Sequence, residues 1–197
     1  ASQAIPIWFL GAAFGAEDAG QFAIAFAFTA LPAQVIGAAL GAVFPAQILA
    51  ALRSGEASRL IARSTWALAA FLSPPFAIMY WASPWMFELV FGADWAAAGD
   101  YAQALCLWLF FQGVSRPAVS AIPALGLQAH LLAFEITTLA ARSLALFGSV
   151  QLFGKGLIPI WSLSVLSAAL CALLAAATIS RARRIDTPAS HNLTKSI

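Results

Sequence analysis

Long apolar stretches separated by short polar connectors constrain this chain more than any other feature of its sequence. The longest stretch runs from 21 to 52 and holds no Asp, Glu, Lys or Arg. Of the 197 residues, 62% are hydrophobic and only 9% are charged, whereas a soluble domain is typically about 25% charged. So few ionic groups cannot cover a water-facing surface, which argues against soluble enzymes, disordered chains and disulfide scaffolds. The sequence therefore predicts an all-α integral membrane protein.

The apolar stretches predict one partial and five complete transmembrane spans. Residues 1–15 are shorter than the roughly 20 apolar residues of a full span. We therefore expect them to be the end of a helix that begins upstream, and the chain to be a piece of a longer protein. A signal peptide is the alternative, but no basic n-region precedes the apolar run. The predicted spans are 1–15 (partial), 21–52, 65–82, 97–125, 131–153 and 157–180, and a disordered tail follows at 185–197.

Polar clusters and prolines place the predicted turns and breaks between these spans. Turns are expected at 15–20, 53–63, 91–95, 126–130 and 154–156. Because proline disrupts helical hydrogen bonding, we expect kinks at Pro32 and Pro45 and a break at 73–75. A separate amphipathic segment is expected at 84–90.

The charged residues predict which side of the membrane each connector faces. Alternating sides place 53–63 and 181–184, which hold most of the arginines, on one face, and most of the acids on the other. Since cytoplasmic loops carry the excess of Lys and Arg, the basic face and the C-terminus are predicted to be cytoplasmic. The chain is then expected to be a multi-pass protein of the plasma membrane. An aromatic belt is expected at the outer boundary, formed by Tyr80, Trp81, Trp85, Trp95, Tyr101 and Trp161.

Polar side chains inside the predicted spans are the candidate functional residues, because polar groups in hydrocarbon are costly. Gln112 and Arg116 lie four residues apart and share one helical face. Glu135, Thr138 and Arg142 form a polar stripe on the next span, which Ser149 continues. Counted from the intervening turn, Arg116 and Glu135 come within roughly 5 Å of the same depth, so the two can pair. Arg142 lies two turns farther out, with no carboxylate expected at its depth.

Two interpretations of these residues stay open. In the first, a water-filled cavity lies between the helices and its arginines meet an anionic substrate. In the second, Arg116 and Glu135 form a structural ion pair, while carbonyls or absent parts of the protein satisfy Arg142. A proton-relay role for Glu135 is a third alternative.

The sequence offers no recognisable catalytic or metal site. It has no Ser/His/Asp set, no pair of carboxylates arranged for catalysis, no phosphate-binding glycine loop and no Cys/His cluster. Cys106 and Cys171 are expected to be small buried hydrophobic residues. Ser164, Ser167, Cys171, Ala175 and Thr178 form a small face that favours helix packing, as do Gly37 and Gly41. Without such catalytic motifs we expect no enzyme activity and no cofactor. We expect no nucleic-acid partner, because the net charge is only +2 and no basic face is visible.

Three segments resemble the C-terminal half of bacterial O-antigen and polysaccharide flippases. Residues 19–45, with the LP, IG and VFP elements, resemble their eighth transmembrane helix. The stretch 91–101 (FGADWAAAGDY) resembles the extracytoplasmic element before their tenth helix, and Leu125–Gly126 resembles the short turn that follows that helix. The resemblance extends over about Ala4 to Arg184.

The resemblance implies the multidrug/oligosaccharidyl-lipid/polysaccharide exporter superfamily, whose members have two six-helix lobes and work by alternating access. Residues 1–184 would be the C-terminal lobe, with the N-terminal lobe as its partner. The implied substrate is a polyprenyl-pyrophosphate-linked oligosaccharide flipped across the inner membrane. Arg142 and Arg116 are the candidate pyrophosphate ligands in this cavity, joined by Gln112, Glu135 and Thr138.

Two alternatives to a flippase follow from the same features. A drug or cation antiporter of the same superfamily would use Glu135 as its coupling carboxylate. A polymerase or other non-transport membrane subunit of polysaccharide synthesis would be expected to have a large basic outer loop. The outer loop at 82–96 is short and acidic, which disfavours that alternative.

The orientation can be tested by cysteine labelling of the intact membrane. On a background lacking Cys106 and Cys171, a cysteine at Ser54 or Ser190 should react only from the cytoplasmic side. A cysteine at Ala93 should react only from outside. The opposite labelling pattern would contradict the orientation inferred from the arginines.

Overall fold

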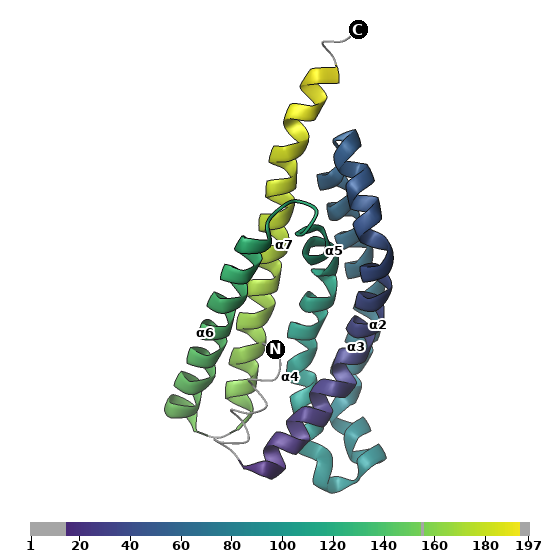
Figure 1. Cartoon of the computed structure of the whole chain (residues 1–197). Helices are drawn as coiled ribbons and strands as arrows, with labels where there is room; N and C mark the ends of the chain where they lie inside the picture. The colour runs from purple at the N-terminus through teal and green to yellow at the C-terminus, as the bar shows by residue number, and fades with distance from the viewer. Residues whose placement is uncertain (1–14, 155, 194–197) are drawn as a thin grey trace.

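The computed structural model of the protein describes residues 15–154 and 156–193 (Figure 1). Within these ranges the chain is all-helical and has no strand, which confirms the predicted fold class at that level. A short 3-10 helix, η1 (Ala93–Trp95), precedes α4. The α-helices are α2 (Ala16–Ser54), α3 (Ala57–Phe91), α4 (Ala96–Val114), α5 (Arg116–Ala121), α6 (Gln128–Phe153) and α7 (Leu157–Leu193). The predicted partial span at 1–15 lies outside the described residues except for Gly15.

Three helices of the described part are long and apolar enough to cross a membrane. They are Glu17–Ser54, Gln128–Phe153 and Leu157–Asp186, and they correspond to the predicted spans 21–52, 131–153 and 157–180. The protein is therefore a membrane protein. Helices α3 and α4 are not among the three, so the six-span lobe stays a prediction.

The helix ends differ from the predicted turns in three places. Helix α2 begins at Ala16, so the predicted turn at 15–20 is helical. The connector predicted at 53–63 shrinks to Gly55 and Glu56, because Gly55 takes a left-handed φ of 72° and reverses the chain at once. Helix α7 continues to Leu193, past the predicted end of its span at 180. The disorder predicted for 185–197 stays a prediction. Residues 194–197 lie outside the described part.

Helix α3 is continuous where the sequence predicted a break at 73–75 and a separate segment at 84–90. A proline removes the N–H that would bond to the carbonyl four residues earlier. For Pro84 that carbonyl belongs to Tyr80, and the side-chain amide of Gln103 on α4 donates to it at 3.0 Å. Membrane helices tolerate proline where a neighbouring helix satisfies the freed carbonyl. A contact from α4 therefore helps α3 to continue as one helix.

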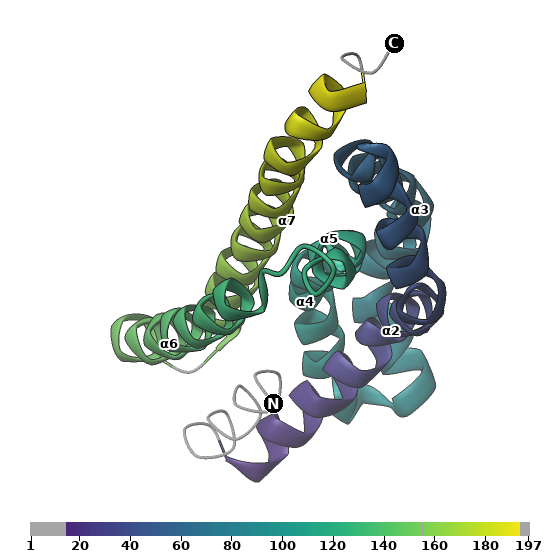
Figure 2. The ribbon, with the colours of Figure 1, turned by 45° about the horizontal axis from the view of Figure 1, so that its top comes forward.

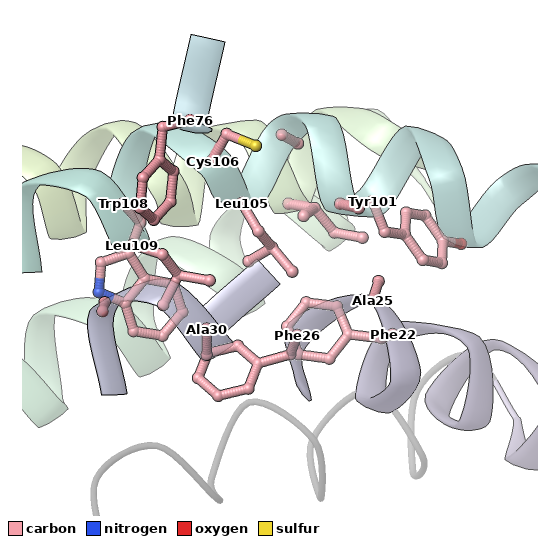
Figure 3. Packing of buried hydrophobic residues seen from close by; sticks show 14 of the residues in the cluster. Phe22, Ala25, Phe26, Ala30, Phe76, Tyr101, Leu105, Cys106, Trp108 and Leu109 are labelled. Atoms are coloured by element: carbon pink, nitrogen blue, oxygen red, sulfur yellow. The ribbon is translucent and has the colours of Figure 1, made fainter. Parts of the chain in front are cut away.

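Helix α4 is the centre of the packing, with α2 and α3 on one side and α7 on the other (Figure 2). Helix α6 packs mainly on α7. The main core lies where α4 meets α2 and α3, and it is rich in aromatic rings (Figure 3). The rings of Phe26 and Trp108 have centroids 5.6 Å apart, and those of Phe76 and Phe110 are 5.8 Å apart. Burial of these rings stabilises the bundle centre.

Tyr101 belongs to this core and not to the predicted aromatic belt. Its side chain is 7% exposed, and its hydroxyl is 3.3 Å from a carboxylate oxygen of Asp18 on α2. Trp81 and Trp85, by contrast, are exposed, as the belt prediction requires. The hydrogen-bonding carboxylate of Asp18 lets the phenol group of Tyr101 be buried without losing its polar partner.

The alternating course of the helices places the charged residues at opposite ends of the molecule. One end holds the α2–α3 turn and the last turns of α7, with their arginines, and is uppermost in Figure 1. The other end holds the start of α2 and the α3–η1–α4 connection, with Asp18 and Asp94. Across that second end, the Gln21 amide donates to the Asp94 carbonyl at 2.9 Å. This separation of charge agrees with the one expected from the sequence.

The close approach of α3 and α4 at Gly99 gives a stability prediction. A Cβ added at Gly99 would lie 2.7 Å from the Ser83 carbonyl oxygen and 2.8 Å from the Pro84 Cα. Because these are backbone atoms, they cannot rotate away. We expect Gly99→Ala to destabilise the protein by about 1–3 kcal/mol in thermal unfolding in detergent.

Gly148→Ala on α6 is the matched control, because nothing lies within 4 Å of its added Cβ. The control should be neutral or slightly stabilising, since alanine favours helix more than glycine does. Equal stability of the Gly99 variant and wild type would contradict the close packing of α3 on α4.

Candidate functional site

Helix α6 turns several polar residues toward the protein and many large apolar residues outward. Its buried residues are Thr138, Arg142, Leu146 and Ser149, which recur every three to four positions along one face. Its exposed large apolar residues are Leu132, Ile136, Leu144, Phe147, Leu152 and Phe153. Of the polar stripe predicted from the sequence, Thr138, Arg142 and Ser149 therefore pack inward, whereas Glu135 is exposed. Such an arrangement is typical of a helix between lipid and a polar interior.

Arg142 is the charged residue at the centre of this face. Its side chain is 7% exposed, and the guanidinium carbon lies 4.8 Å from the centroid of the Trp108 ring on α4. Trp108 itself is fully buried. A guanidinium stacked over an indole in a desolvated place gains about 2 kcal/mol or more from the cation–π interaction. The ring therefore fixes the position of the guanidinium without using its N–H donors.

Hydroxyl groups of α7 are buried at a similar depth. Ser164 and Ser167 are fully buried on α7, and Thr138 is buried on α6. Arg142 lies eleven residues before the end of α6 and Ser167 ten residues after the start of α7. At about 1.5 Å per residue the two are at nearly the same depth. The small face predicted on α7 is confirmed as a buried face, and part of it is polar.

Several polar atoms of this region have no hydrogen-bond partner among the described residues. They are Trp108 Nε1, Arg116 Nε, Thr138 Oγ1, Arg142 Nε, Ser164 Oγ and Ser167 Oγ. A buried polar group left without a partner costs about 1–3 kcal/mol. Their concentration between α4, α6 and α7 marks an interior that can accept a polar or anionic ligand, or ordered water.

Three of the predicted site residues lie in the neighbourhood of Cys171 on α7. Arg142, Glu135 and Arg116 are near enough for their charges to act on the thiol, and Ser115 lies beside it. These residues come from α6, from α7 and from the junction of α4 and α5. Arg116, Glu135 and Arg142 thus share one α7 neighbour, although they are spread over 27 positions of sequence.

Arg116 reaches its place because Gly37 on α2 has no side chain. A Cβ at Gly37 would lie 3.2 Å from Arg116 Nε and 3.4 Å from its Cζ. Nothing lies within 4 Å of a Cβ at Gly41. The pair Gly37 and Gly41, read from the sequence as a helix-packing motif, therefore has a different role: one glycine makes room for a guanidinium, and the other is open.

Glu135 lies on the exposed side of α6, and its charge acts on Arg142 as well as on Cys171. The two residues are two helical turns apart, so the expectation that Arg142 has no carboxylate at its own depth stays a prediction. The ion pair expected between Arg116 and Glu135 stays a prediction. Gln112 is half-buried one turn before Arg116, and its backbone carbonyl accepts a hydrogen bond from the Ser115 hydroxyl at 3.0 Å.

Sequence reasoning missed three contributors to this site: Trp108, Ser115 and the polar role of Ser164 and Ser167. Trp108 lies in an apolar run, so nothing in its own segment distinguishes it from other core residues. The two serines were assigned to close packing, which their burial supports, but their orphaned hydroxyls became visible only in three dimensions. The one available signal was the unusual polarity of a small face inside a membrane helix.

The stacking of Arg142 on Trp108 can be tested by a double-mutant cycle. Trp108→Leu, Arg142→Met and the double variant should give a coupling free energy of about 1–2 kcal/mol in detergent unfolding. A second cycle of Trp108→Leu with Arg63→Met should be additive within about 0.5 kcal/mol, since Arg63 is remote. Additivity in the first cycle would show that the contact contributes nothing.

Chemical inspection and comparison with known proteins identify no further centre. Within the described residues, no group of three or more His, Cys, Asp or Glu side chains could hold a metal ion. Comparisons with protein-family models, with curated proteins and with solved structures find no match to this chain.

Proposed function

We propose that this chain is the C-terminal transmembrane lobe of a bacterial flippase. The protein moves a polyprenyl-pyrophosphate-linked oligosaccharide, such as an O-antigen, capsule or exopolysaccharide unit, across the inner membrane by alternating access. Two features support the proposal: the sequence resemblance carried by 19–45 and 91–101, and the polar interior around Arg142. No chemical step is required, since the substrate crosses the membrane unchanged.

The buried Arg142 is the observation that carries the proposal. A guanidinium cannot lose its proton in a protein and so needs an anion, carbonyls or water when it is buried. Here the flat face of the Arg142 guanidinium lies against the Trp108 ring, and Arg142 Nε lacks a hydrogen-bond partner among the described residues. The planar fork of arginine matches the paired oxygens of a phosphate group. A pyrophosphate that enters from the cavity between the lobes would meet these donors.

The neighbouring residues would assist in defined ways. Arg116, set beside α2 by Gly37, would supply the second positive charge for a pyrophosphate. Hydroxyl groups of Thr138 and Ser167 would donate hydrogen bonds to it. The charge of Glu135 acts on Arg142, and we propose that it weakens anion binding enough for release. In a transporter, a moderate affinity for the substrate favours transport more than tight binding does, because the substrate must also be released.

The proposed orientation puts the basic end in the cytoplasm. Arg53, Arg59 and Arg63 lie at this end, together with Arg181, Arg183 and Arg184 of α7. The positive-inside rule then gives a cytoplasmic C-terminus in the inner membrane. Substrate would load from this side and leave at the acidic side.

The function can be tested in a strain that lacks the gene and carries full-length variants. Arg142→Ala should abolish surface polysaccharide while the protein level in the membrane stays near that of wild type. Arg142→Lys should recover only part of it, because a point charge replaces a planar fork. The immunoblot of membranes and the polysaccharide gel are the two measurements. Arg53→Ala serves as a control that removes one arginine outside the site.

Normal polysaccharide from the Arg142→Ala strain would contradict the role of Arg142. The antiporter alternative makes a different prediction in the same strains. It expects Glu135→Gln to stop proton-driven export of cationic dyes, whereas the flippase expects dye export to be absent from wild type as well. Reconstituted vesicles with an imposed pH gradient distinguish the two.

Arg116→Ala should lower the membrane level of the protein if Glu135 is its structural partner, since a charge would be left unpaired. The double variant Arg116→Ala/Glu135→Ala should then recover part of that level. If the membrane level of the double variant is no higher than that of Arg116→Ala, Arg116 and Glu135 do not form a structural pair.

A further inference from the structure

Three arginines surround one pocket at the basic end of the molecule, away from the polar interior described above. The pocket has a volume of about 350 Å³ and is lined by Ser58, Arg59, Ala62, Arg63, Trp66 and Arg183. Five of these residues come from the first three turns of α3, and Arg183 comes from α7. The small side chains of Ser58 and Ala62 leave the space that the guanidinium groups enclose.

The carboxylates near this pocket are already engaged. Both oxygens of Asp186 accept hydrogen bonds from the start of α3, at 3.2 Å from the Ala57 nitrogen and 2.8 Å from the Ser58 nitrogen. Glu56 pairs with Arg59 at 3.5 Å, and both side chains are largely exposed. Each guanidinium has five N–H donors, so one partner leaves others for a ligand. No acid is among the lining residues.

The contact of Asp186 also explains why the pocket exists. It ties the last part of α7 to the first turn of α3, which brings Arg183 beside Arg59 and Arg63. A carboxylate at a helix N-terminus is favourable because of the helix dipole and the free N–H groups. With that terminus occupied, an incoming anion would contact the arginines and not the α3 backbone.

The position of Trp66 places the pocket at the edge of the membrane. Its indole, which is apolar except for the ring N–H, is 77% exposed, and Trp66 stands at the start of the predicted span 65–82. Tryptophan prefers the boundary between hydrocarbon and lipid headgroups. The three arginines lie on the water side of that boundary, at the depth of phospholipid phosphates.

We propose that this pocket binds the headgroup of an anionic phospholipid, with its phosphate held by Arg59, Arg63 and Arg183. The acyl chains lie along α3 past Trp66, toward exposed Phe71. Basic pockets between membrane helices are suited to such headgroups. A bound lipid joins α3 to α7 from outside, and so strengthens at this end the link that Asp186 makes. This site is separate from the proposed transport interior.

Native mass spectrometry of the full protein in detergent tests the site, with phosphatidylglycerol and phosphatidylcholine as the two probes. Wild type should retain phosphatidylglycerol in preference to phosphatidylcholine. Each arginine near an anionic headgroup contributes about a fivefold factor in affinity, so Arg59→Gln/Arg63→Gln should weaken phosphatidylglycerol binding about 20-fold. Arg53→Gln/Arg184→Gln removes the same charge at the same end outside the pocket and should change it less than threefold.

Four results would overturn the proposal. The first two are an equal loss of phosphatidylglycerol affinity in the two double variants and equal retention of the two lipids by wild type. The others are unchanged lipid binding by Arg59→Gln/Arg63→Gln, and protection from thermal unfolding that is as strong with inorganic phosphate as with phosphatidylglycerol. If the double variant fails to fold, Arg63→Gln alone should weaken phosphatidylglycerol binding about fivefold. An unchanged affinity in that folded single variant would equally overturn it. Polysaccharide export is measured separately, so failure of the lipid site leaves the transport proposal standing.

Discussion

The position of α4 between two pairs of helices is the constraint on which the rest of the structure depends. On one side its Gly99 lets the backbone of α3 approach, and its Gln103 satisfies the carbonyl that Pro84 frees. On the other side its Trp108 supports the guanidinium of Arg142. The Gln103 and Trp108 contacts have the same physical basis, because a polar group inside a membrane must find its partner within the protein.

This arrangement explains why an arginine can be kept on α6 at all. Helix α6 packs mainly on α7 and turns its apolar residues outward. The aromatic face of Trp108 and the buried hydroxyls of α7 lie behind it. Aromatic rings of α2, α3 and α4 pack around Trp108 (Figure 3), and the Trp108 ring in turn supports the guanidinium of Arg142. Donor groups held in place before binding reduce the entropy cost of capturing an anion.

The basic end uses the same chemistry for a different purpose. There the Asp186 carboxylate joins α7 to α3 at their water-facing ends, and the arginines around it remain open to the surface. Of the two interior arginines, Arg142 is buried and Arg116 is half-buried, whereas the six arginines at the basic end are exposed. The first arrangement suits selective contact with one ligand, and the second suits attraction to a charged membrane surface.

Periodicity and composition by themselves determined the membrane class, the all-helical fold, the inward position of Thr138, Arg142 and Ser149 on α6, and the small buried face of α7. These features depend on which residues recur along one helix, and that is fully contained in the local sequence. Only the tertiary structure decided that α3 runs unbroken, that Tyr101 is buried beside Asp18, that Gly37 accommodates Arg116 and that Trp108 carries Arg142. Each of these depends on a partner from another helix. A one-dimensional pattern shows that a polar or aromatic residue needs a partner, but it does not contain the distances that identify which one.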